Sequence, residues 1–218
     1  MAESNGNPAN LAKRTLTAII VAPMVIAVVM AGPRVFYPAL LAAAALGVNE
    51  SLRLAGRISP ATAGPLLAFA YVVLPMSCLG LIYSTRSGPV WVIFTLIATW
   101  LADTSAYAVG RLFGRRPLAP RISPNKTLEG ALGGLAVTAP VLAALTFLPV
   151  LSMAERFVFG LALVPAAIAG DLFESWLKRR AGVKDSGNLL PGHGGFLDRI
   201  DSLLFTAPLS YLLLRFWI

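Results

Sequence analysis

The chain has 218 residues, of which 57% are hydrophobic and 13% charged, whereas a soluble domain is about half apolar and a quarter charged. A mean hydropathy of +0.75 agrees with this imbalance, and together they exclude a water-soluble globule. One membrane span needs about 20 apolar residues, so seven spans would use about 140 and leave no room for a separate soluble catalytic domain. Any chemistry must therefore use the few polar side chains at the ends of spans or between them.

Positive charge dominates the ionisable residues, with 18 Lys and Arg, ten Asp and Glu, one His and a net charge of +8. Basic residues on short connections between apolar segments are typical of membrane orientation and contact with anionic headgroups. We therefore expect no nucleic-acid partner. Cys78 is the single cysteine, which excludes an intramolecular disulfide and indicates no cysteine-based metal site.

The apolar runs predict an all-α, polytopic membrane bundle of about seven helices. Residues 1–12 are expected to be a disordered tail, because they are polar and lack periodicity. The first apolar run follows Lys13 and Arg14 and is interpreted as a retained helix, because more spans follow it. We expect one membrane domain, with N-terminal helices in 13–88 and a catalytic region in 89–218. The predicted helices cover 15–31, 35–55, 61–84, 89–110, 130–153, 157–178 and 202–218.

The basic residues alternate between the gaps that separate these spans. Most of them fall before the first span and after the second, fourth and sixth. The positive-inside rule places that side in the cytoplasm, with the N-terminus inside and the C-terminus outside. The expected location is a bacterial-type inner membrane with the active site facing the cytoplasm.

Glu50 lies late in the second predicted span, where Arg53 and Arg57 follow it. An acid and a base at i and i+3 are neighbours on a helix. We therefore expect a structural ion pair between Glu50 and Arg53 at the membrane interface.

Asp103 lies in the fourth predicted span, where ionisable groups are costly and by default indicate function. Asp103, Tyr107 and Gly110 share one helical face at i, i+4 and i+7. The alternative is a polar contact between helices, but Thr104 or Ser105 would supply that contact at lower cost. We interpret Asp103 as a functional interior residue.

The sixth predicted span carries Asp171, Glu174, Ser175 and Lys178 at i, i+3, i+4 and i+7. Two carboxylates, a hydroxyl and an ammonium group therefore lie along one stripe. On a soluble helix this would be an ordinary ladder of ion pairs, but in a membrane span such a density of polar groups indicates a site.

The gap after the fourth span contains a candidate phosphate site. Ser123 is a plausible N-cap with Pro124 at the first helical position, which places Asn125, Lys126 and Thr127 in the first turn of a helix. Free N–H groups, a lysine and a hydroxyl at a helix start bind phosphate. A capped helix with a lysine flanking the membrane explains this segment equally well.

The gap after the sixth span is rich in glycine, which lets a backbone approach a ligand closely. Asp198 and Asp201 follow at i and i+3, which the helix dipole alone could explain. Beside Asp171 and Lys184, however, they suggest acids for a divalent cation and bases for phosphates. His193 is the only histidine, so a multi-histidine zinc site is excluded; it is a turn residue or contacts a base or phosphate. The glycines are Gly182, Gly187, Gly192, Gly194 and Gly195.

Two segments carry a family resemblance. SWLKRRAGVKDSGNLLPGHGGFLDRID, residues 175–201, and DTSAYAVGRLFGRRPLAPRISPNKTLEG, residues 103–130, resemble the signatures of the CDP-diacylglycerol synthase (phosphatidate cytidylyltransferase) family. The resemblance implies an integral membrane enzyme that joins CTP and phosphatidic acid to give CDP-diacylglycerol and pyrophosphate. It also implies one or two Mg²⁺ ions and a homodimer. The phosphate monoester of the lipid is already anionic, so no catalytic base is required.

On this resemblance we expect residue roles as follows. The catalytic residues are Asp171, Asp198, Lys126 and Lys184, with both lysines on the triphosphate. The metal ligands are Asp171 and Asp198, with Asp201, Glu174 and Asp103 in reserve. The substrate-binding residues are Ser123, Asn125, Thr127, Lys178, Arg179, Gly192, His193, Gly194, Gly195 and Arg199, with Lys178 and Arg179 at the phosphatidic acid headgroup.

Two alternatives remain. Acids at membrane depth and segments interrupted by glycine also occur in transporters and channels, but the chain shows no inverted repeat. A CTP-dependent polyprenol kinase or an archaeol-type cytidylyltransferase would use similar chemistry, and the long segment of residues 175–201 favours the diacylglycerol enzyme over both.

Overall fold

The computed structural model describes residues 21–58, 63–146, 151–187 and 194–217. Residues Val21–Met30 form a short apolar helix. The elements that follow are α2 (Pro33–Ile58), α3 (Ala63–Tyr83), α4 (Gly88–Phe113), β1 (Pro117–Ala119), β2 (Ser123–Thr127), α5 (Leu128–Ala144), α6 (Met153–Arg180) and α7 (Leu197–Trp217). The expected all-α architecture is confirmed, with one small hairpin added.

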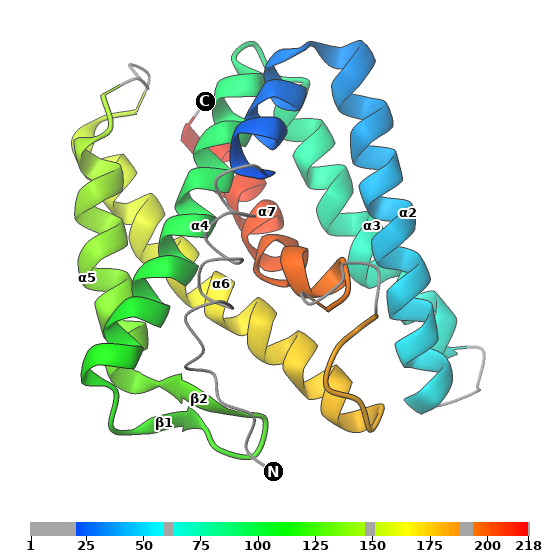
Figure 1. Cartoon of the computed structure of the whole chain (residues 1–218). Helices are drawn as coiled ribbons and strands as arrows, with labels where there is room; N and C mark the ends of the chain where they lie inside the picture. Colours follow the sequence, from blue (N-terminus) through cyan, green and yellow to red (C-terminus); the bar gives the residue numbers. More distant parts are fainter. Residues whose placement is uncertain (1–20, 59–62, 147–150, 188–193, 218) are drawn as a thin grey trace.

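The helices form a single bundle (Figure 1). Helix α5 packs against α4 and α6, α7 packs against α3 and α6, and α2 packs mainly against α3. Beyond the end of α6 the chain turns back into the bundle, where α7 begins. The start of α7 is therefore an interior feature, and Leu197 is fully buried.

Four helices are long and apolar enough to cross a membrane: α2, α3 from Gly64 onward, α4 and α6. Helix α5 is apolar but has only 17 residues. The chain is thus an integral membrane protein by the length and composition of its helices, while the count of seven spans stays a prediction. The tail at 1–12 and most of the first predicted helix lie outside the described residues.

Three helix boundaries differ from the prediction by four residues or more. Helix α5 ends at Ala144 instead of residue 153, α6 begins at Met153 instead of 157, and α7 begins at Leu197 instead of 202. A capping box explains the earlier start of α6: Glu155 N–H donates to Ser152 Oγ (3.2 Å), while the Glu155 carboxylate accepts from Ser152 N–H (2.7 Å). This satisfies N–H groups that have no partner within the helix.

The prediction of a helix that begins at Ser123 is wrong. Ser123–Thr127 is an extended strand, paired antiparallel with Pro117–Ala119. Helix α5 begins one residue after the strand, because Thr127 is its N-cap and accepts from Gly130 N–H (3.1 Å). The hairpin keeps the chain extended as far as Thr127, so the helix begins after Thr127 and not after Ser123.

Glu129 anchors this hairpin to α5. Its carboxylate accepts the backbone N–H groups of Arg115 (3.0 Å) and Arg116 (3.1 Å), and Leu128 N–H donates to Arg116 carbonyl oxygen (2.9 Å). These donors favour the charged carboxylate and hold the pKa of Glu129 below its ordinary value. The end of α4 and the start of α5 are therefore joined through β1 and β2.

Buried hydroxyl pairs connect the helices inside the bundle. Thr99 on α4 lies 2.7 Å from Thr206 on α7, and Ser105 on α4 lies 3.2 Å from Thr138 on α5. Such pairs satisfy polar groups between membrane helices. Ser105 thus makes a polar contact between α4 and α5 of the kind that was considered as the alternative role of Asp103.

Candidate active site

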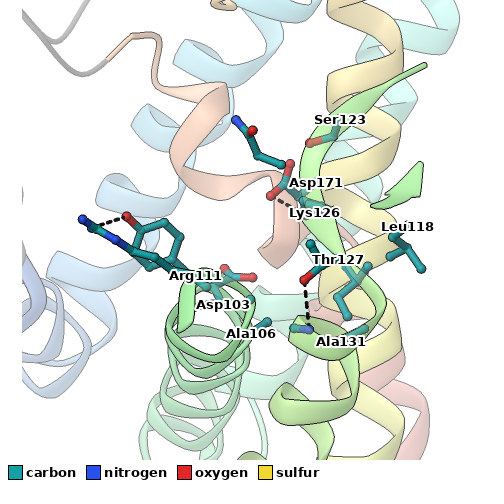
Figure 2. A pocket seen from close by; sticks show the side chains of 14 residues that line it. Asp103, Ala106, Arg111, Leu118, Ser123, Lys126, Thr127, Ala131 and Asp171 are labelled. Atoms are coloured by element: carbon teal, nitrogen blue, oxygen red, sulfur yellow. Dashed lines mark hydrogen bonds and ion pairs between the residues drawn. The ribbon is translucent and has the colours of Figure 1, made fainter. Parts of the chain in front are cut away.

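A cavity of about 580 Å³ opens between α4, the hairpin, α5 and α6. Figure 2 shows its side chains converging from these separate elements. The predicted site residues that line it are Asp103, Ser123, Asn125, Lys126, Thr127 and Asp171. Tyr107 and Gly110 also line it, which confirms that the face shared with Asp103 is turned toward one site.

An ion pair between Lys126 and Asp171 lies in this cavity. Lys126 Nζ is 2.5 Å from Asp171 Oδ2, and the side chains are 22% and 34% exposed. The hairpin carries the lysine and α6 the aspartate, so the pair exists only because the strand lies across the helix (Figure 2). Both groups remain accessible to a ligand that enters the cavity.

Two further carboxylates, Asp103 and Asp201, lie near the ion pair. Asp103 on α4 accepts a hydrogen bond from Ser202 Oγ on α7 (3.0 Å). Asp201, the neighbour of Ser202, is half-buried and interacts electrostatically with Asp171 and Asp103. Helices α4, α6 and α7 thus each contribute one acid to the same region.

The donor set fits a hard divalent cation that is held partly by a substrate. Carboxylate oxygens are the ligands that Mg²⁺ prefers, and Mg²⁺ usually binds one or two protein carboxylates plus phosphates and water. Within the described ranges, no three Asp, Glu, His or Cys side chains come close enough to enclose a metal ion. The carboxylates of this region that could join the phosphates of a substrate around such a cation are Asp103, Asp171 and Asp201.

Lys178 is the centre of a second cluster. Its Nζ lies 2.6 Å from Glu174 Oε2 and 2.5 Å from Asp198 Oδ1. Asp198 Oδ2 accepts from Ser186 N–H (3.1 Å), Ser186 Oγ (3.0 Å) and Gly195 N–H (2.7 Å). Asp198 thus binds both described ends of the glycine-rich segment. Glu174 is fully buried, and its Oε1 has no hydrogen-bond partner.

The prediction of an ion pair between Glu50 and Arg53 is wrong. Glu50 is only 5% exposed and accepts hydrogen bonds from Ser186 Oγ (2.8 Å), Phe196 N–H (3.0 Å) and Leu197 N–H (2.8 Å). The helix turns Glu50 into the bundle, while Arg53 is exposed. The signal in the sequence was an acid in an apolar run, and it was misread as the partner of the nearby arginines.

The remaining predicted residues are distributed around these two clusters. Arg179 Nε donates to the carbonyl oxygen of Ile122 in the hairpin (3.4 Å), while Lys184 and Arg199 are exposed. Gly194 has a φ of +80°, a conformation that favours glycine. Gly192 and His193 lie outside the described residues.

Sequence reasoning missed Arg111, although it lies in the segment that carried the resemblance. Arg111 lines the cavity and its Nη1 donates to Tyr107 Oη (3.2 Å). Both side chains are exposed. Arg111 thus adds a second cation to the cavity, on the wall opposite the hairpin (Figure 2).

Comparison with known proteins shows a match to the model of the cytidylyltransferase family over residues 61–217. The chain belongs to the cytidylyltransferase family. It is similar to the phosphatidate cytidylyltransferase of Staphylococcus aureus (strain COL), with 44% identity over 135 residues, which are 61% of this chain and 52% of the relative. The Staphylococcus saprophyticus enzyme of the same name is 43% identical over 152 residues, 68% of this chain and 57% of the relative.

The chain spans about half the length of the curated relatives it matches. The matched range contains the whole cavity and the cluster around Lys178. Glu50 precedes that range, although it contacts residues inside it.

Proposed function

We propose that this chain transfers the cytidylyl group of CTP to phosphatidic acid and releases pyrophosphate. The observation that carries the proposal is the cavity in which Lys126 and Asp171 meet, inside the family range of a membrane protein. The names of the similar proteins support phosphatidic acid as the acceptor.

The reaction needs charge stabilisation more than proton transfer. A phosphate oxygen of phosphatidic acid attacks the α-phosphorus of CTP, a new P–O bond forms, and the bond to the β-phosphate oxygen breaks. The electron pair leaves with pyrophosphate. The attacking oxygen is already anionic, so the site must bring two polyanions together and stabilise the leaving group. Fixed cations beside carboxylates suit this task.

The hairpin side of the cavity is suited to the triphosphate. Lys126 supplies a positive charge, and Ser123, Asn125 and Thr127 add polar groups from the same strand. Arg111 on the opposite wall is placed for a second phosphate group, such as the lipid headgroup. Lys184 is a further expected triphosphate contact, although it is not among the lining residues.

Asp171, Asp103 and Asp201 are the residues that would hold Mg²⁺ together with the phosphates of the substrate. The ion would offset negative charge on the reacting phosphates. In this structure Lys126 and Asp171 neutralise each other. Lys126 would bind a phosphate group of the nucleotide, and Asp171 would then be available to hold the cation.

Asp198 and Glu174 differ from these three aspartates, because they are occupied by Lys178. Both bind Lys178, so a direct role as metal ligands requires that Lys178 turn away, for example toward the headgroup of phosphatidic acid. In this structure both carboxylates bind the lysine, and Asp198 also binds the two described ends of the glycine-rich segment.

The proposed setting is the cytoplasmic face of a bacterial inner membrane, with the N-terminus inside. The support is the basic hairpin and the basic end of α6, Lys178, Arg179 and Arg180, which suit an anionic inner surface. We also propose a homodimer, which light scattering of the detergent-solubilised protein tests directly.

The deciding experiment uses purified protein in detergent with phosphatidic acid, CTP labelled at the α-phosphate, and Mg²⁺. The expected product is labelled CDP-diacylglycerol, formed in equal amounts with pyrophosphate. Phosphorylation of a polyprenol from γ-labelled CTP, or ion flux in liposomes, without any CDP-diacylglycerol would refute the proposal in favour of the kinase or the transporter.

A further inference from the structure

Glu50 places a buried carboxylate at the start of the last helix. It lies on α2, yet the N–H groups of Phe196 and Leu197 both donate to it, across a separation of 147 positions for Leu197. The first N–H groups of a helix have no partner within the helix. A local side chain usually supplies the cap, but here a distant helix does so. The position of the α7 start thus depends on α2.

The same carboxylate also reaches the glycine-rich segment. Ser186 Oγ lies 2.8 Å from Glu50 Oε2 and 3.0 Å from Asp198 Oδ2. A hydroxyl has one hydrogen to donate, so the two carboxylates share a single donor. Asp198 in turn binds Lys178. A continuous polar network therefore runs from α2 through Ser186 to α7 and α6.

Two glycines leave the space that this contact requires. A Cβ atom at Gly187 would lie 2.5 Å from Glu50 Oε1, and a Cβ at Gly195 would overlap both Glu50 and Ser186. Any side chain at either position would displace the carboxylate. The close approach is therefore built into both partners, on α2 and on the segment that precedes α7.

We propose that Glu50 is a positioning residue for the cytidylyl transfer, acting through Ser186 and the start of α7. Asp201 lies one helical turn beyond Leu197, so the cap that Glu50 provides also determines how Asp201 faces Asp171. Asp198 lies within the same turn. This inference rests on the proposed function for its effect on catalysis, but the structural contact can be measured without it.

The test compares Glu50→Ala and Glu50→Gln with the matched control Ser51→Ala. Ser51 is the buried neighbour on the same helix, and its hydroxyl bonds only to backbone carbonyls of Val48 and Ala68 among the described contacts. Loss of Ser51 Oγ weakens α2 packing without touching the segment that precedes α7. Glutamine keeps the length and one oxygen acceptor of Glu50, so it should rescue part of the function.

Hydrogen exchange is the readout that does not need activity. In the Glu50→Ala variant, peptides that contain Phe196 and Leu197 should exchange at least about tenfold faster, because a hydrogen bond to a charged group is worth about 1.5 to 3 kcal/mol. Peptides from α4 should be unchanged. The Ser51→Ala protein should retain the wild-type exchange rate at Phe196 and Leu197.

Kinetics supply the second readout. We expect kcat of the Glu50→Ala variant to fall by about tenfold or more while KM for CTP changes by less than about threefold, because misplaced acids affect the transition state more than ground-state binding. Glu50→Gln should give an intermediate kcat. In a double-variant cycle, Ser186→Ala should add little to Glu50→Ala, because both act through one network.

Wild-type exchange and kcat in the Glu50→Ala protein would overturn the inference, as would an equal loss of kcat in Ser51→Ala. If Glu50→Ala does not fold, the isosteric Glu50→Gln protein decides through the same exchange measurement. If the wild type forms no CDP-diacylglycerol, the proposed function fails, whereas the exchange comparison still shows whether Glu50 holds the start of α7.

Discussion

Replacing Lys126 by methionine separates its structural role, the ion pair with Asp171, from its proposed role at the phosphates of the substrate. The ion pair with Asp171 is partly exposed, with 22% and 34% of the side chains accessible. Such pairs contribute about 1 kcal/mol or less to stability. For a domain of this size the loss corresponds to a fall in Tm of only about 2–4 °C.

The proposed catalytic contribution is much larger. A fixed donor aimed at charge that develops in the transition state is worth about 3 to 4 kcal/mol, or a factor of about 100 to 1,000 in kcat. Lys126→Met should therefore lose nearly all turnover while it unfolds almost like the wild type. The assay is CDP-diacylglycerol formation in detergent, with thermal unfolding measured on the same samples.

Two further variants sharpen this test. Arg121→Met removes an exposed cation from the same hairpin, outside the cavity lining, and should keep wild-type activity. The exchanged pair K126D/D171K can restore the ion pair and its stability, but it places the cation on α6 and should remain inactive. Wild-type turnover in either Lys126→Met or the exchanged pair would refute the assignment of Lys126 to the phosphates.

The other predictions use the same preparations. Asp171→Asn should lower kcat by at least about 100-fold with an unchanged yield of folded protein, and wild-type turnover would remove Asp171 from the site. Because N–H donors from Arg115 and Arg116 hold the pKa of Glu129 below its ordinary 4.5, ionised Glu129 stabilises the hairpin above that pH, and the contribution is lost as the pH falls through the lowered pKa. Glu129→Gln should remove this acid-dependent part of the Tm profile, and identical profiles would contradict it. In a Cys78→Ala background, a cysteine introduced at the N-terminus should resist an impermeant label applied outside the cell; rapid labelling would reverse the orientation.

Local periodicity accounts for the relations between side chains on one helix that were predicted correctly. Asp103, Tyr107 and Gly110 line one cavity because residues at i, i+4 and i+7 share a helical face. Glu174 and Lys178 pair at i and i+4 for the same reason. These relations depend only on the geometry of a single helix, so they can be predicted from the sequence without knowledge of how the helices pack.

The hairpin was not predictable in the same way. Ser123 and Thr127 are both suitable N-caps, and a helix from either would satisfy the local pattern. Thr127 is the N-cap because the Glu129 carboxylate binds the backbone of Arg115 and Arg116, which holds the preceding strand across α6. That contact places Lys126 against Asp171, which no spacing in the sequence indicates.

Composition alone predicts that the protein lies in a membrane and that a few acids and bases are the candidates for its chemistry, because the burial of apolar spans and the cost of charge within them do not depend on the arrangement of the helices. Which of these groups meet depends on the tertiary structure. Glu50 caps a helix that begins 147 positions later, since hydrogen-bond partners so distant in the chain are brought together by the packing of whole helices and not by any local preference.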